Sequence, residues 1–138
     1  MTTIALDHFI VPVHDREGSA EQLAALFGVP WEPAGGGEFA PVYINEELTL
    51  DFLQVEEPIR PHHYCFRVDE AEFDAIFERI QAAGLKYRSS PRGQDDMTVN
   101  TRSGGKNIYW SEPGGHIWEM LTKSYARQGM RSGAAARA

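Results

Sequence analysis

Hydrophobic positions along the chain follow strand and helix spacings, and these predict the same order of elements in each half. In the first half, the pattern predicts a strand, a helix that ends at Gly28, and two strands joined by a turn; the segments are 4–13, 17–27, FAPVYI and LTLDFLQV. In the second half, it predicts a strand, an amphipathic helix that ends at Gly84, and three strands; the segments are 62–68, 69–84, TVNTR, KNIYW and HIWEMLT.

The two halves align as an internal repeat of roughly 55–60 residues, with β-α-β-β-β as the unit. DHFIVPV aligns with HHYCFRV, and LTLDFLQV aligns with HIWEMLT. One such unit cannot bury both faces of its sheet, so we expect the two units to pack as one domain. The sequence therefore predicts an α+β fold, in which two βαβββ modules form a curved mixed sheet with a concave metal-binding face. The modules cover about residues 3–57 and 61–125, and a flexible tail follows at 126–138.

Four polar residues occupy matched positions in this repeat. His8 and His63 lie early in the first strand of each module, whereas Asp51 and Glu119 lie in the last strand of each. Side chains alternate across a strand, and the apolar neighbours of these four residues should face the helices. We therefore expect all four polar side chains to lie on the opposite, concave side of the sheet.

Two imidazoles and one carboxylate form a donor set that binds a divalent metal, such as zinc, nickel, iron or manganese, and leaves positions free for substrate. Cys65 is the single cysteine of the sequence, so a structural zinc site built from several thiolates is not expected. A strand histidine taken alone is more often a packed or solvated residue than a ligand. The prediction of a metal site therefore depends on the whole set of polar residues.

The same segments resemble the vicinal oxygen chelate superfamily, also called the glyoxalase/bleomycin-resistance/dioxygenase fold. The resemblance covers about residues 3–125, and it is carried by LDHFIVPV, HHYCFRVDEAEFDAIFERI and above all KNIYWSEPGGHIWEMLT. It implies a metal site made of His8, His63 and Glu119. Asp51 stands where glyoxalase I relatives have a fourth ligand, and its shorter side chain also suits a base or a contact to bound water.

Other positions are candidates for contact with the substrate. Tyr109 matches a tyrosine that reaches the substrate in fosfomycin-type relatives, although a strand aromatic in this place is as often part of the core. Cys65 has the same strand parity as His63 and so faces the predicted cleft. Arg67 and Arg102 are candidates for binding an anionic group of the substrate.

Several positions depart from particular branches of the family. Ile10 stands where fosfomycin-type enzymes have a hydroxyl residue, and the sequence has no potassium-binding serine loop. Extradiol dioxygenases use a further histidine in the pocket, but His14 and His62 are poorly placed for that role. His116 is expected to face away from Glu119 on its strand. Lyase or isomerase chemistry of the glyoxalase type is therefore favoured over dioxygenation.

Charge and composition narrow the range of partners. The 138 residues carry 13 basic and 20 acidic side chains, a net charge of −7, which does not suit nucleic-acid binding. No apolar run approaches the roughly 20 residues of a membrane span, and MTTIALDHFI lacks the features of a signal peptide. The single cysteine fits a reducing compartment, so we expect a cytoplasmic protein.

Two hypotheses about function remain open on the sequence alone. The first is a metal-dependent enzyme that acts on a small oxygenated substrate able to chelate the metal. The second is a metal-free protein of the bleomycin-resistance type, which sequesters a ligand in a cleft. The family resemblance adds the expectation of a homodimer, with strands swapped or modules paired side by side.

Overall fold

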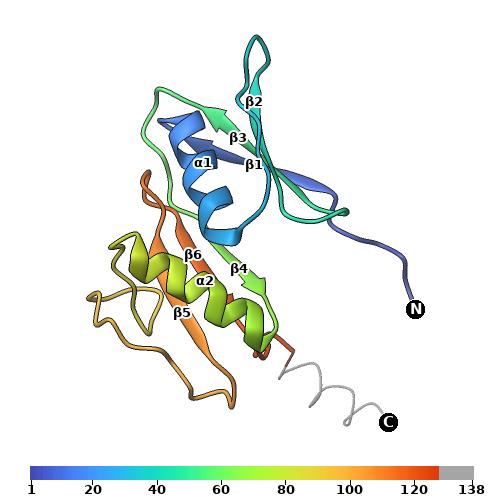
Figure 1. Cartoon of the computed structure of the whole chain (residues 1–138). Coiled ribbons are helices and arrows are strands. Elements are labelled where there is room, and N and C mark those ends of the chain that lie inside the picture. Colours follow the sequence, from blue (N-terminus) through green and yellow to red (C-terminus); the bar gives the residue numbers. More distant parts are fainter. Residues whose placement is uncertain (128–138) are drawn as a thin grey trace.

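Two successive units with the same order of elements form the protein (Figure 1). The structure is a computed structural model that describes residues 1–127, so nearly all of the predicted tail at 126–138 lies outside the described residues. The first unit contains β1 (His8–Val13), α1 (Arg16–Phe27), β2 (Phe39–Tyr43) and β3 (Thr49–Gln54). The second contains β4 (His63–Arg67), α2 (Glu70–Ala82), β5 (Asn107–Ser111) and β6 (Ile117–Leu121).

Each unit builds its own mixed sheet of three strands. The strand orders are β1-β3-β2 and β4-β6-β5, and in each sheet the first strand pairs in parallel with the last strand of its unit. The strand that comes second along the chain in each unit, β2 or β5, pairs antiparallel with that last strand. The α+β class and the internal repeat are confirmed, and β1 and β4 are edge strands of two separate sheets.

The strand predicted at TVNTR does not form. Asn100 makes only an isolated bridge to Asn107, so the second unit has one strand fewer than expected. The reason is local, because the Asp96 carboxylate accepts the backbone N–H groups of Ser89 and Thr98 and holds this segment in a turn. Met97 has a φ of 53°, a left-handed conformation that interrupts an extended strand.

Both predicted helices form, and their ends follow from side-chain and glycine chemistry. The Asp15 carboxylate accepts the N–H of Gly18 at the start of α1, and the Asp69 carboxylate accepts the N–H of Glu72 at the start of α2. Gly28 ends α1 in the left-handed conformation, with a φ of 68°. None of the helices in the described part of the chain is long and apolar enough to cross a membrane.

The two units pack against each other through the inner faces of their sheets. Phe9 of β1 stacks on Tyr64 of β4 with ring centroids 5.1 Å apart, and Phe52 of β3 lies 6.4 Å from Trp118 of β6. Alternate residues of the same strands, among them Val11, Val13 and Leu50, are buried in the core. Residues of opposite parity therefore lie on the outer faces of the two sheets, turned away from this contact.

Candidate metal site

A histidine and a glutamate face each other on the outer side of the second sheet. His63 lies on β4 and Glu119 on the neighbouring strand β6, and Nε2 of His63 is 2.7 Å from Oε1 of Glu119. The pairing register places Cys65, rather than His63, directly beside Glu119, so the imidazole reaches its partner diagonally. The parity argument correctly predicts that both side chains lie opposite the apolar residues Tyr64 and Trp118.

The Glu119 carboxylate is completely buried and is held by hydrogen bonds from several elements. The amide Nδ2 of Asn107 on β5 donates to Oε2 at 3.1 Å. The hydroxyl of Tyr125, four residues beyond the end of β6, lies 2.8 Å from Oε1 and 2.9 Å from Oε2. These contacts compensate for the removal of a carboxylate from water.

Tyr109 and Cys65 complete the immediate surroundings of the pair. Tyr109 is paired with Glu119 across the β5–β6 ladder, and its ring centroid lies 5.7 Å from that of His63. Burial is the main reason why the pKa values of the Tyr109 and Tyr125 hydroxyls are raised. Burial, followed by the charge of Glu119, raises the pKa of the Cys65 thiol to about 12, so this thiol stays protonated near neutral pH.

His8 lies on the first sheet, apart from the His63–Glu119 pair. Its side chain is 61% exposed, and Nδ1 is 2.7 Å from Oδ2 of Asp7. This hydrogen bond, together with the negative charges of Asp7 and Asp51, raises the pKa of His8. Asp51 is paired with Ile10 on β1 and shares the outer face of the sheet with His8, as the sequence predicts.

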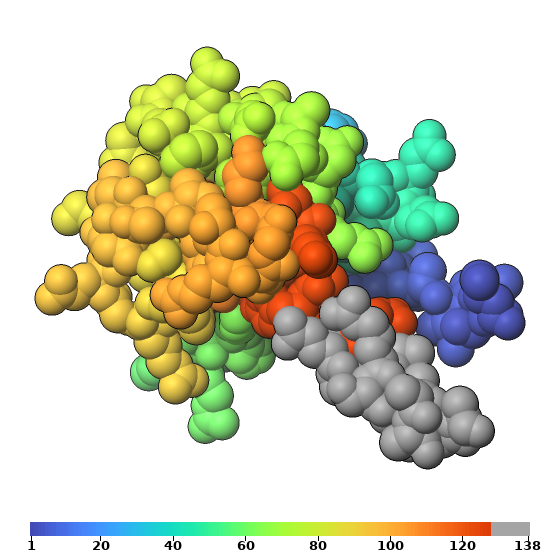
Figure 2. All heavy atoms as spheres, turned by 90° about the horizontal axis from the view of Figure 1, so that it is seen from below, coloured from blue at the N-terminus to red at the C-terminus, as the bar shows by residue number. Residues whose placement is uncertain are grey.

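One chain does not bring the predicted ligands together. Among residues 1–127, no group of three or more His, Cys, Asp or Glu side chains is placed to hold a metal ion. His8 and Asp51 belong to the first sheet, whereas His63 and Glu119 belong to the second sheet. In Figure 2 the dark blue N-terminal segment and the orange segment lie on opposite sides of the view.

The donor atoms fit a divalent cation nonetheless. Asp7 binds Nδ1 of His8, and Nε2 has no hydrogen-bond partner among residues 1–127, which is the usual arrangement of a metal-binding histidine. His63 and Glu119 direct one nitrogen and one oxygen to the same point from adjacent strands. Two imidazoles and a carboxylate suit iron, manganese, nickel or zinc.

Two cavities flank the His63–Glu119 pair. A cavity of about 320 Å³ contains Cys65 and Arg67 in its wall, together with Leu121, Ser124, Tyr125 and Ala126. A cavity of about 310 Å³ lies beside His63 and is also lined by Pro61, His62, Pro91, Arg92 and Ile117. Arg102 lines neither of these two cavities, and its assignment to substrate binding stays a prediction.

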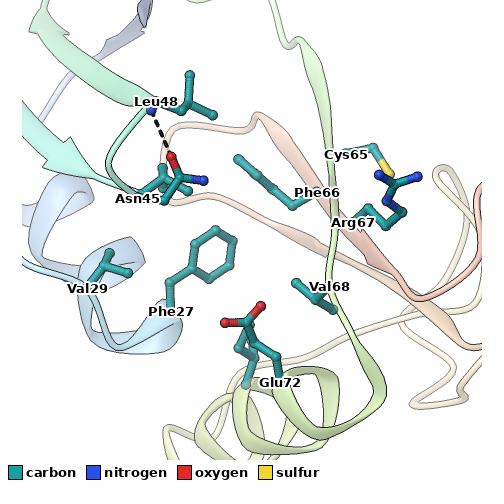
Figure 3. A pocket seen from close by; sticks show the side chains of 11 residues that line it. Phe27, Val29, Asn45, Leu48, Cys65, Phe66, Arg67, Val68 and Glu72 are labelled. Carbon is teal, nitrogen blue, oxygen red and sulfur yellow. Dashed lines mark hydrogen bonds between the residues drawn. The ribbon is translucent and has the colours of Figure 1, made fainter. Parts of the chain in front are cut away.

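A third and larger cavity of about 470 Å³ lies between the two units, next to β4 (Figure 3). Its walls are mainly apolar, and Phe27 and Phe66 meet edge to face there with centroids 5.0 Å apart. The Glu72 carboxylate points into this cavity, whereas the Arg67 guanidinium points away from it toward Cys65 (Figure 3). Arg67 is therefore oriented toward the side of β4 that carries His63 and Cys65.

Sequence reasoning missed four residues around the site. Asn107 lies two residues before Tyr109 on β5, so the alternation of side chains along this strand could have predicted that both face Glu119. Asp7 directly precedes His8, and this adjacency is also visible in the sequence. Tyr125 and Arg92 lie outside the regular elements, and no periodicity in the sequence places their side chains beside His63 and Glu119.

Comparisons with known proteins identify several proteins that are similar to this chain. No family model matches the chain. A solved structure named Oxidase ChaP-H2 is 40% identical with a TM-score of 0.83, and the match covers 91% of this chain and 98% of that one. A structure of FosX from Listeria monocytogenes, in complex with Mn(II) and a dihydroxypropylphosphonic acid, is 20% identical with a TM-score of 0.67, covering 96% of this chain and 99% of that one.

Metallothiol transferase FosB from Shouchella clausii is 27% identical over 85 residues, or 62% of this chain, and the match spans about half (53%) of the length of FosB. The identity to Oxidase ChaP-H2, in contrast, extends over nearly all of both chains. It agrees with the repeated β-α-β-β units and with the sequence segments that carry the family resemblance. The chain therefore belongs to the vicinal oxygen chelate superfamily.

Proposed function

We propose that this protein is a metal-dependent enzyme whose site is formed by His63 and Glu119 of one chain and His8 of a second copy. The observation that carries the proposal is the 2.7 Å contact between Nε2 of His63 and Oε1 of Glu119. Two donors from adjacent strands form part of a facial triad and need a third. His8 is exposed, its Nε2 has no hydrogen-bond partner within residues 1–127, and in that part of the chain it forms no metal-binding group with the pair.

A homodimer supplies the missing donor. β1 and β4 are edge strands whose outer faces carry His8 and His63 respectively. A two-fold axis that brings β1 of one protomer to β4 of its partner also brings the reciprocal pair together, so one symmetric contact completes two sites. The apolar residue Ile10, 47% exposed beside His8, is available for burial in such a contact.

The reaction we propose is oxidation of a small substrate that binds the metal through two neighbouring oxygen atoms, with dioxygen as the co-substrate. The high identity to a protein named an oxidase supports this choice over the lyase or isomerase chemistry that the sequence favours. A divalent cation in this site supplies Lewis-acid polarisation of substrate oxygens or redox chemistry. Lyase or isomerase chemistry is the second candidate.

The residues around the site have separate roles in this proposal. In this proposal Asp51, which shares a sheet face with His8, acts as a base toward the substrate. Tyr109 directs the substrate from beside His63, and Arg67 attracts an anionic oxygen from the wall of its cavity. Cys65 contributes a neutral thiol to the same wall. A cytoplasmic location stays a prediction from the sequence.

Elemental analysis of protein purified without chelator or affinity-tag metal tests the proposal. Wild-type protein is expected to carry close to one divalent ion per chain, and His63→Ala and Glu119→Ala are expected to lose it because each removes a donor. The matched control is His14→Ala, since His14 is an exposed histidine whose Nε2 contacts the carbonyl of Glu57 outside the site. This control should retain the metal.

The identity of the metal separates the two reaction classes. Iron supports oxidation, whereas nickel, zinc or manganese without iron supports the lyase or isomerase candidate. Wild-type protein that remains metal-free after reconstitution with each of these ions would contradict the proposal. That result would favour the ligand-sequestering alternative of the bleomycin-resistance type.

A further inference from the structure

Two side chains that the proposed function does not use converge on the Glu119 carboxylate. Asn107 approaches from β5, and Tyr125 approaches from the segment after β6. Glu119 is completely buried, and Asn107 is only 6% exposed, so water cannot easily replace the contact between these two side chains. The two residues therefore control which oxygen of the carboxylate is available to a ligand.

Asn107 fixes one end of the carboxylate. Its Nδ2 donates to Oε2 of Glu119 at 3.1 Å. Its backbone is held independently, since its N–H and carbonyl group both bond to Asn100 at 2.9 Å. The side-chain amide can therefore be changed while the β5 backbone keeps its place, and the amide itself is presented rigidly to the carboxylate.

Tyr125 contacts the carboxylate from the irregular segment that follows β6. Its hydroxyl lies 2.8 Å from Oε1 and 2.9 Å from Oε2, so it bridges both oxygens and opposes rotation of the group. The same tyrosine lines the cavity of about 320 Å³ that contains Cys65 and Arg67. Tyr125 thus links the orientation of the carboxylate to the wall of a flanking cavity.

The two oxygens of Glu119 are consequently not equivalent. Oε1 faces Nε2 of His63 at 2.7 Å, whereas Oε2 is directed toward the amide of Asn107. A cation bound between the imidazole and the carboxylate would meet Oε1. Without the Asn107 amide and the Tyr125 hydroxyl, the carboxylate would be free to rotate and to offer both oxygens to the cation.

We propose that Asn107 and Tyr125 are positioning residues that present Glu119 to a divalent cation through Oε1 alone. This inference rests on the proposed metal site. It assigns the two residues a role in metal affinity and coordination mode, separate from the folding of β5 and β6. Partners of this kind typically change metal affinity by about 10–100-fold when they are removed.

Cobalt(II) binding to the full-length, metal-free protein tests this role. Dissociation constants are measured by titration, and the visible absorption spectrum reports the coordination of the bound ion. Tyr125→Phe removes one hydroxyl, and Asn107→Leu replaces the amide with a somewhat larger apolar group of the same branching. Each variant is expected to bind Co(II) about 10-fold or more weakly, with a changed spectrum. Thermal unfolding of the metal-free variants confirms that they are folded.

The matched controls delete the same groups elsewhere in the second unit. Tyr87→Phe removes the hydroxyl of a largely buried tyrosine that has no contact with Glu119, and Asn100→Leu removes an amide that donates to the Ser89 carbonyl. Both controls should keep the wild-type affinity and spectrum. If Asn107→Leu does not fold, Tyr125→Phe decides the question, because it removes a single oxygen from the protein.

The outcomes separate this inference from the proposed function. Wild-type binding of Co(II), with unchanged affinity and spectrum in Tyr125→Phe and Asn107→Leu, would overturn the positioning role and leave the metal site intact. A wild-type chain that binds no Co(II), and no other divalent ion, would overturn both. Weaker binding in the two controls to the same extent as in the two variants would also overturn the positioning role.

Discussion

The two most informative residues of the site, His8 and Glu119, have opposite environments. The His8 side chain is 61% exposed, whereas Glu119 is fully buried. Burial of an ionised carboxylate costs several kcal/mol unless it is compensated. Asn107, Tyr125 and His63 each supply a hydrogen bond, and bonds to a charged group contribute about 1.5–3 kcal/mol each. Glu119 is therefore held by residues of its own chain, whereas the His8 side chain is exposed to solvent.

At the same scale, Cys65 should be a poor nucleophile although part of it is exposed. Its pKa is raised to about 12 from 9.0, and only the thiolate reacts with iodoacetamide. In the metal-free folded protein we expect alkylation at pH 8 at least about 100-fold slower than in the urea-unfolded chain. The rate should still rise above pH 10, because the thiolate forms only as the pH approaches the raised pKa. Equal rates in the folded and unfolded chains would show that Glu119 and burial do not protect the thiol.

The sequence predicts part of this residue-scale picture. Strand parity correctly places His63 and Glu119 on one face, because alternation is a local property of a strand. The contact of Tyr125 with Glu119 cannot be predicted in this way, since Tyr125 lies in an irregular segment whose path depends on tertiary packing. The site assignments of His8, Asp51, Tyr109, Arg67 and Arg102 stay predictions.

At the scale of elements, the β5–β6 hairpin serves both the site and the contact between the units. Its strands carry Asn107, Tyr109 and Glu119, while its turn carries the buried residues Glu112 and His116. Glu112 accepts from Ser19 of α1 at 2.7 Å, and His116 Nε2 lies 2.7 Å from the Pro12 carbonyl of β1. The turn therefore ties the second unit to the first.

Removal of the hydroxyl of Ser19 should weaken this tie. Ser19→Ala leaves the buried Glu112 carboxylate with one donor fewer, and within residues 1–127 only the N–H of Gly114, at 2.7 Å, still donates to it. We expect the free energy of unfolding, measured in urea, to fall by about 1–3 kcal/mol. Ser103→Ala, at a partly exposed serine of the 101–106 turn, is the control and should change it by less than about 0.5 kcal/mol. A loss for Ser19→Ala no larger than that of the control would contradict the account.

Elements are predicted well where the pattern is periodic and poorly where side chains hold the backbone. Both helices and six strands follow from spacing, because an apolar face or stripe must be buried. The segment around TVNTR has the composition of a strand, but the Asp96 turn and the buried Arg88, which bonds to Asp95 and the Pro91 carbonyl, fix it as a loop. Competition of this kind is invisible to periodicity.

At the scale of the whole molecule, the packing of the two units determines how the site can be completed. The aromatic contacts between Phe9 and Tyr64 and between Phe52 and Trp118 close the inner faces on each other. The single concave face expected from the sequence is therefore replaced, within one chain, by two outer faces that each carry part of the ligand set. The repeat could be predicted from the sequence, but the relative orientation of its copies could not, because it depends on contacts between residues far apart in the chain.

A metal analysis of mixed dimers tests this account most directly. His8→Ala and Glu119→Ala chains with different metal-free affinity tags are co-expressed, and the heterodimer is purified through both tags. If each site combines His8 of one protomer with His63 and Glu119 of its partner, one site is intact and the other lacks both residues. We predict about one divalent ion per heterodimer, compared with none in either homodimeric variant and about two in the wild-type dimer. A heterodimer without metal, or a wild-type protein that is monomeric and binds metal, would contradict the shared site.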